Sequence, residues 1–310
     1  SVLIVYKYQH FIYEVLNIHS PDANILSFTL PLGISFYIFQ AISFSIDNSR
    51  KNDKAYIAAS NYFLYICFFP QLIAGPIERA NKMFCQFNFK VKLHEVNWSK
   101  AFTLISLGLY KKLFISDNLD QILGELTQNP HDLNFLYIWI AVLMYSVRVY
   151  ADFSAYTDMA IGIGLIFGIK LSDNFNAPYL ATSPIEFWKR WHITLSKWFK
   201  DYLYIPLGGS RKGSLNTFCA TMLTFSICGL WHGANWTFIF YGLLHGLYFI
   251  PLVYSGKMNK SQIVAKGKLI PSFKELFKML ALFVLIMLTD IFFRANTVTE
   301  AFNYIASFFS

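Results

Sequence analysis

The chain has 310 residues, of which 55% are hydrophobic, 19% aromatic and only 14% charged, whereas about 25% of residues are charged in an ordinary soluble domain. This composition excludes a water-soluble globular protein, because no such core could bury so much apolar surface. The net charge of +8 does not indicate nucleic-acid binding, since the Lys and Arg residues lie in short segments between apolar stretches, as in loops that face anionic lipid.

Apolar stretches recur along the whole chain, and a full crossing of a bilayer needs about 20 such residues. We expect an all-α, polytopic transmembrane bundle that forms a single domain over residues 1–310. The stretches cover residues 1–16, 27–46, 56–74, 101–115, 133–150, 161–169, 217–231, 236–254 and 276–293.

The charges of the intervening loops predict which stretches cross the membrane. Residues 79–100 are basic, 116–132 are acidic and 170–212 are again basic. Because basic loops stay in the cytoplasm, only one net crossing can separate the last two segments. We therefore expect residues 161–169 to form a re-entrant or broken helix.

A second broken segment is expected at residues 56–74. The loops on both sides of this stretch are basic, so a half-crossing that breaks at Pro70 or at Gly75–Pro76 satisfies the charge pattern. Irregular backbone at membrane depth is tolerated only where protein or a water-filled cavity shields it. Two broken segments therefore indicate an internal cavity.

Residues 183–201 have the pattern of one amphipathic helix lying at the cytoplasmic interface. Ser183 is the expected N-cap, with Pro184 at the first helical position and Glu186 three residues past the cap. His192 falls at the edge of the apolar face. It is either part of an interfacial anchor or, together with Arg190, the rim of a cytoplasmic entrance for an anionic donor.

The segment Gly229-Leu230-Trp231-His232-Gly233-Ala234-Asn235-Trp236 carries the stronger signal. An ionisable side chain within a transmembrane stretch is costly, and by default it faces the bundle interior and has a function there. His232 can act as a general base on a hydroxyl or be a structural histidine bonded across helices. The loop charges place His232 in the outer half of the membrane, well separated from His192.

Other polar residues within apolar sequence favour structural roles. His245 is expected to pack or to form a hydrogen bond. Asp158 is expected to cap the helix that follows it, whereas Asp152 either pairs with a buried histidine or lines a cavity. Residues 204–211 form a tight turn followed by cations, which is only a weak phosphate-binding pattern. No metal-type spacing occurs among the cysteines.

Several motifs, in order along the chain, resemble the membrane-bound O-acyltransferase family, and specifically its bacterial branch typified by the membrane subunit of alginate O-acetylation. They are Gly75-Pro76-Ile77-Glu78-Arg79, Asp152-Phe153-Ser154 through Asp158-Met159-Ala160, Asn174-Phe175-Asn176-Ala177-Pro178-Tyr179, Glu186-Phe187-Trp188-Lys189-Arg190-Trp191-His192, the segment Asp201–Gly209, Gly229-Leu230-Trp231-His232-Gly233 and Phe293-Arg294-Ala295.

This resemblance implies an acyltransferase in which His232 matches the signature histidine and His192 a second histidine associated with activity. It implies acetyl-CoA as the cytoplasmic donor substrate, no bound cofactor or metal, and a tunnel to an acceptor outside. It further implies an exported or cell-surface polysaccharide, an extracytoplasmic partner of the SGNH type, and the bacterial cytoplasmic membrane. Family members usually have further N-terminal passes, which this chain is expected to lack.

The sequence hypothesis is that a thioester donor binds near Arg190 and His192, and that His232 is the general base. Three class-level alternatives stay open: a transporter, for which no duplicated halves are visible, a scaffold for a partner enzyme, and D-alanyl rather than acetyl transfer. Further substrate-binding residues are expected at Trp191, Trp231, Asn235 and Asp152.

Overall fold

The computed structural model describes residues 7–17, 31–50, 58–87, 91–126, 135–256, 258 and 270–308. The chain forms two compact units, the first comprising residues 1–110 and 155–173 and the second residues 111–154 and 174–310. Within the described parts the secondary structure is helical throughout. The expectation of one functional domain over residues 1–310 stays a prediction.

The first unit contains short and medium helices around a core in which Tyr65 and Met83 are fully buried. Buried Glu78 accepts hydrogen bonds from Ser172 and forms an ion pair with Lys82, so the motif around Pro76 has a structural role. The elements are α1 (Gln9–Leu16), α2 (Ile34–Ser49), α3 (Ala59–Cys67), α4 (Phe69–Leu72), α5 (Ala80–Phe84), the 3₁₀ turn η2 (Leu93–Glu95) and α6 (Trp98–Tyr110).

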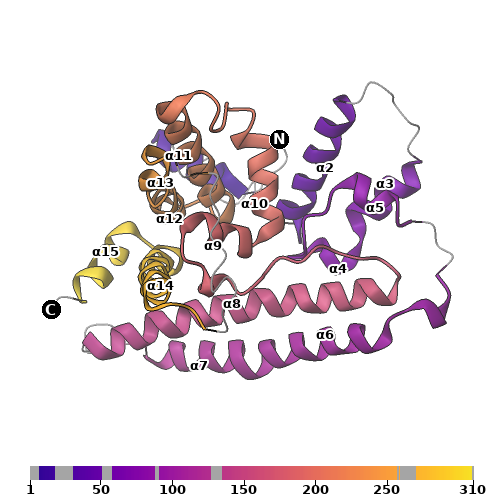
Figure 1. The fold of residues 1–310 in the computed structure, drawn as a ribbon, viewed down its shortest axis with the longest axis horizontal. Coiled ribbons are helices and arrows are strands. Elements are labelled where there is room, and N and C mark those ends of the chain that lie inside the picture. The colour runs from indigo at the N-terminus through magenta and orange to yellow at the C-terminus, as the bar shows by residue number, and fades with distance from the viewer. Residues whose placement is uncertain are drawn as a thin grey trace. The chain divides into compact units, whose positions relative to one another are not determined.

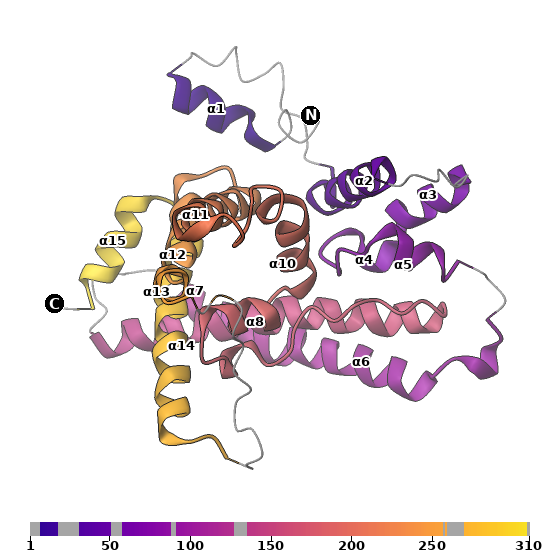
Figure 2. The same cartoon turned by 45° about the horizontal axis from the view of Figure 1, so that its top comes forward.

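The second unit contains the longer helices of the C-terminal half. Figure 1 shows α11, α12 and α13 gathered together, and in Figure 2 α14 is seen from the side with α12 at its C-terminal half. The elements are the π-turn η3 (Lys111–Ser116), α7 (Asp117–Leu126), the 3₁₀ turn η5 (Pro178–Leu180), α9 (Pro184–Arg190), α10 (Ile193–Phe199), the π-turn η6 (Lys200–Tyr204), α11 (Gly213–His232), α12 (Trp236–Leu247), α13 (Ile250–Tyr254), α14 (Phe273–Arg294) and α15 (Val298–Ala306).

One helix, α8 (Phe135–Ile166), runs from the second unit into the first. It joins two stretches that the sequence pattern separated, so the prediction of a re-entrant or broken helix at residues 161–169 is wrong. Asp158 lies inside this helix and not at its N-terminus, which also overturns its predicted capping role. The apolar pattern looked interrupted because polar side chains occur in mid-helix, while the backbone hydrogen bonds continue through them.

Four of the helices in the described ranges are long and apolar enough to cross a membrane: residues 135–166, 213–232, 236–254 and 273–294. Helix α6, with 13 residues, is too short to qualify alone. The acidic segment expected to be a loop begins as helix α7. Residues 127–132 of that segment, and much of the basic segment after residue 256, lie outside the described residues, so the predicted orientation in the membrane stays a prediction.

The predicted break within residues 56–74 is confirmed. Helix α3 ends at Cys67, and Phe68 has an extended backbone with φ −63° and ψ 101° before α4 begins at Phe69. Pro70 lies in the first turn of α4, where its missing N–H costs no intrahelical hydrogen bond. Whether this segment is a half-crossing stays a prediction.

Candidate active site

The predicted helix over residues 183–201 is two helices, α9 and α10, with a break at Trp191–His192. The Ser183 cap is confirmed, since its hydroxyl accepts a hydrogen bond from the backbone N–H of Glu186. His192 adopts the left-handed conformation, with φ 40° and ψ 55°. For a residue other than glycine this costs about 1–3 kcal/mol, and such backbone strain is concentrated at functional sites.

Two asparagines of the segment before α9 hold this junction in place. The Oδ1 atom of Asn174 accepts hydrogen bonds from the backbone N–H of Thr194 at 3.1 Å and from its hydroxyl at 2.7 Å. The backbone N–H of Asn176 donates to the Arg190 carbonyl at 2.9 Å. Asn174 is 1% exposed, so these bonds are shielded from water. They fix the chain on both sides of His192.

The His192 side chain is buried among aromatic rings. Its ring centroid lies 4.6 Å from that of Phe153 and 6.3 Å from that of Trp231. Neither ring nitrogen has a hydrogen-bond partner among the residues that the structure describes. Burial, together with the neighbouring His232, lowers the pKa of His192 well below 6.5. His192 is therefore a neutral imidazole at physiological pH.

His232 is the last residue of α11, which packs closely against α12. A Cβ atom added at Gly229 would collide with the backbone carbonyl of Phe238, and one at Gly242 with that of Phe225. The two glycines let the helix backbones approach, as small residues do in membrane helix pairs. His232 is partly exposed and its ring lies 5.2 Å from Phe293.

The predicted separation of His192 from His232 is wrong. The ring of Trp231 neighbours both histidines, with its centroid 6.3 Å from that of His192 and 4.9 Å from that of His232. His245 belongs to the same cluster, because Tyr241 lies 4.6 Å from it and 5.9 Å from His232. The sequence pattern treated 183–201 as a surface helix, whereas the break buries His192 against α11.

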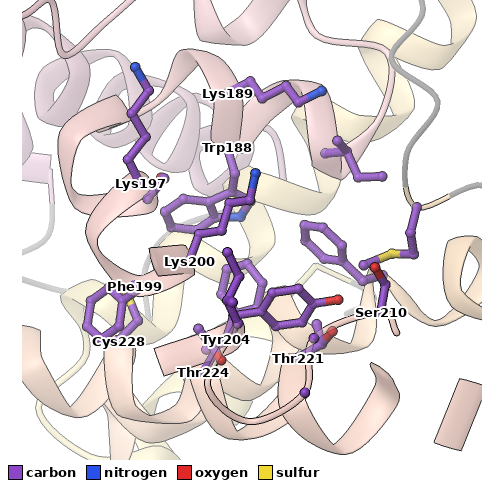
Figure 3. A pocket seen from close by; sticks show the side chains of 18 of the residues that line it. Trp188, Lys189, Lys197, Phe199, Lys200, Tyr204, Ser210, Thr221, Thr224 and Cys228 are labelled. Carbon is purple, nitrogen blue, oxygen red and sulfur yellow. The ribbon is translucent and has the colours of Figure 1, made fainter. Parts of the chain in front are cut away.

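A cavity of about 710 Å³ opens beside this histidine cluster, and we name it the basic cavity. Figure 3 shows Trp188, Lys189 and Lys200 on one side of it, with Tyr204, Ser210 and Thr221 opposite. Four cationic residues of its lining are exposed, namely Lys189, Lys197, Lys200 and Arg211. The inner wall includes the buried residues Thr221, Thr224 and Cys228 of α11.

The inner wall of the basic cavity leads along α11 towards His232. Thr221, Thr224 and Cys228 are spaced three and four residues apart, so they share one helix face. His232 follows Cys228 by four residues and continues that face. Trp188, which also lines the cavity, packs against His245 with their ring centroids 5.0 Å apart.

Other predicted site residues have clear structural partners. Arg190 forms an ion pair with Glu186 at 2.8 Å and does not line the basic cavity. Trp191 packs on Phe175 and Phe187. The Asn235 side chain caps α12 by accepting from the Thr237 N–H and donates to the Asn296 carbonyl. Their predicted roles in substrate binding stay predictions.

Asp152 pairs with a lysine and not with a buried histidine. Its carboxylate lies 2.8 Å from the ammonium group of Lys112, which also contacts Asp117 at 2.8 Å. These hydrogen bonds raise the pKa of Lys112. The side chain of Asp152 is 36% exposed, so it is no buried partner for an imidazole.

Sequence reasoning missed a buried acid and the cavity cations. Asp290 is 8% exposed within α14 and accepts a hydrogen bond from Ser146 at 2.6 Å. It was missed because the apolar run around it is otherwise unbroken. The cavity cations Lys189, Lys197 and Lys200 fall on the polar face of the single helix that the sequence predicts over residues 183–201. The break between α9 and α10 brings these three lysines to one rim of the cavity. A pattern that treats residues 183–201 as a single helix could not predict this.

Comparison with known proteins identifies the family of this chain. The model of the membrane-bound O-acyltransferase family matches residues 3–300, which includes both histidine segments and the basic cavity. The chain belongs to this family. Family membership and the four apolar helices identify it as a multi-pass membrane protein.

Individual relatives are bacterial proteins. The chain is 40% identical to "Probable alginate O-acetylase AlgI" of Pseudomonas putida over 255 residues, which are 80% of this chain and 52% of that protein. It is 37% identical to "Peptidoglycan O-acetyltransferase" of Helicobacter pylori over 97% of this chain and 61% of that protein. "Teichoic acid D-alanyltransferase" of Bacillus subtilis is 30% identical over 82% of this chain and 65% of that protein. The chain spans between half and two thirds of these relatives' lengths.

Proposed function

We propose that this chain is the membrane O-acyltransferase part of a system that acetylates an exported or cell-surface polysaccharide. The observation that carries the proposal is the basic cavity, whose rim is cationic and whose inner wall includes Cys228, about one helical turn before His232 on α11. Relatives named as O-acetylases or O-acetyltransferases are 37–43% identical to the chain, and the D-alanyltransferases 27–30%, which favours acetyl over D-alanyl transfer.

The donor in this proposal is a cytoplasmic thioester of the acetyl-CoA type. Lys189, Lys197 and Lys200 supply positive charge for phosphate groups, and the pantetheine arm follows the inner wall. His232 removes the proton from an acceptor hydroxyl, whose oxygen attacks the thioester carbonyl. The C–S bond breaks, an ester C–O bond forms, and the thiolate takes up the proton from the imidazolium.

His192 has a supporting role in the same proposal. As a buried, neutral ring against Trp231, it keeps a second positive charge away from His232. This favours proton uptake by His232 during the reaction. An extracytoplasmic partner of the SGNH type, and residence in a bacterial cytoplasmic membrane, complete the proposed system.

The test is transfer of labelled acetyl groups from acetyl-CoA in membranes that contain the full chain. We expect His232→Ala to lower the rate by about 100-fold to 10,000-fold, while the variant remains folded and membrane-inserted. His94→Ala is the matched control, since that side chain is 74% exposed in η2, and it should keep wild-type activity. Near-normal transfer by His232→Ala would remove the proposed base, and absence of transfer by wild type with its partner present would remove the proposed donor.

A further inference from the structure

A second, smaller pocket lies at the C-terminal end of α14, and we name it the tyrosine pocket. Its volume is about 250 Å³, below the range of about 300–1,000 Å³ typical of sites for drug-sized ligands. It therefore has room for one small ring and not for an extended chain. Its polar lining consists of Tyr145 from α8, Arg294 from the end of α14, Asn296, and Glu300 and Tyr304 from α15.

The polar groups of this pocket include a hydroxyl without an internal partner. The Tyr304 hydroxyl oxygen is buried and has no hydrogen-bond partner within the described part of the chain. The Arg294 guanidinium lies 5.7 Å from the Tyr145 ring centroid, and Glu300 accepts a hydrogen bond from the Asn296 N–H at 2.9 Å. A buried hydroxyl is costly unless it is bonded, so a ligand with hydroxyl groups would stabilise this site.

Two contacts connect the tyrosine pocket to His232. Phe293 directly precedes Arg294, and its ring lies 5.2 Å from the His232 ring. Asn235, three residues after His232, donates a hydrogen bond to the carbonyl of Asn296 at 2.9 Å. The pocket rim and the segment after the proposed base are thus held together.

We infer that the tyrosine pocket is an acceptor subsite that binds a single hydroxylated sugar ring. The tyrosines in the lining offer an aromatic wall for the apolar C–H groups of such a ring, and the guanidinium and carboxylate groups suit its hydroxyls. The apolar residues Val142, Ile291 and Ala295 complete the lining. The inference rests on the proposed function, because it assigns the acceptor side to the same reaction.

The test measures sugar binding without any acyl donor. The full chain in nanodiscs is titrated with methyl glucoside and methyl glucuronide, and binding is followed by saturation-transfer NMR. We expect saturable binding of at least one glycoside by wild type and equally by His232→Ala. Tyr304→Phe, which removes only the unbonded hydroxyl, and Arg294→Gln should each weaken binding about tenfold. Tyr204→Phe in the basic cavity is the matched control and should bind like wild type.

Each outcome decides the inference. Absence of saturable binding of both glycosides, or wild-type binding by folded Tyr304→Phe, would overturn it. Acetyl transfer to a seryl peptide by a chain that binds neither glycoside would also overturn it and point to a protein hydroxyl as acceptor. Because no donor is present in the titration, failure of the acetyl-CoA assay with intact glycoside binding would refute the proposed function separately.

Discussion

The two histidines of the candidate site are held by opposite kinds of structure. His192 lies at a break between two short helices, in a left-handed backbone conformation fixed by Asn174. His232 ends a regular helix of 20 residues whose position is set by backbone packing at Gly229 and Gly242. The position of His192 therefore depends on a few buried hydrogen bonds. The position of His232 depends on the lack of side chains at Gly229 and Gly242. Substitutions at Gly242 and at Asn174 should distinguish support by helix packing from support by hydrogen bonds.

The largest effect on stability is expected where a side chain is added between α11 and α12. Gly242→Leu places its Cβ against the Phe225 carbonyl, and overpacking against backbone should cost about 3 kcal/mol or more. Thermal unfolding of the detergent-solubilised protein, followed by size-exclusion chromatography, measures this. Gly124→Ala in α7 is the control, because its Cβ would meet open space; it should be neutral or stabilising by up to about 1 kcal/mol. Equal stability of the two variants would contradict the packing account.

The next effect concerns the polar support of His192. Asn174→Ala removes the acceptor of two buried hydrogen bonds to Thr194, at a cost of about 1–3 kcal/mol. Release of the strained junction should lower kcat of acetyl transfer about 10-fold to 100-fold, with little change in KM. Asn118→Ala, an exposed side chain in α7, is the control. An unchanged kcat in a folded Asn174→Ala protein would show that the junction does not position His192 for the reaction.

A smaller effect is expected at the rim of the basic cavity. Lys189→Gln and Lys200→Gln remove exposed positive charges, so KM for acetyl-CoA should rise several-fold each while kcat stays constant. The rise should shrink at high salt, because exposed charges are screened. Lys274→Gln at the start of α14 is the control. A KM that is insensitive to both substitutions and to salt would place the donor phosphates elsewhere.

The smallest effect is a dependence of stability on pH. His192 has a lowered pKa in the folded chain but titrates at about 6.5 when unfolded. Below about pH 6.5 the unfolded state binds more protons, so acid lowers the free energy of unfolding, by at most about 1.4 kcal/mol per pH unit for one group. His192→Gln should remove this contribution from thermal unfolding curves recorded between about pH 5 and 8. An identical slope in both proteins would contradict the buried neutral imidazole.

The same contrast explains what the sequence could predict. The hairpin of α11 and α12 follows from apolar runs, glycine positions and the N-cap at Asn235, all of which are local patterns. The break at His192 has no glycine or proline to mark it, and it exists because Asn174, distant in sequence, bonds the chain beyond it. Ser183 predicted where α9 begins, but nothing local predicted where it ends.

Long-range pairing also explains the errors in the membrane segments. Asp158 is expected from the sequence to cap a helix, yet it lies inside α8. Asp152, expected to pair with a buried histidine or to line a cavity, pairs instead with Lys112. Asp290 was overlooked inside an apolar run, and its partner Ser146 is 144 residues away in sequence. A single polar residue in an apolar stretch thus gives no local indication of whether it ends a helix or is bonded within one. The family motifs mark both histidines in the sequence but do not indicate how far apart they lie in the fold.

The most direct measurement is a structure of the full chain with an acetyl-CoA analogue whose thioester sulfur is replaced by a methylene group. The account predicts phosphates beside Lys189, Lys197, Lys200 and Arg211, the pantetheine arm along Thr221 to Cys228, and the acetyl carbonyl next to His232, with room for an acceptor oxygen within about 3 Å of its ring. An analogue bound outside the basic cavity, or with its acetyl group directed away from His232, would contradict the account.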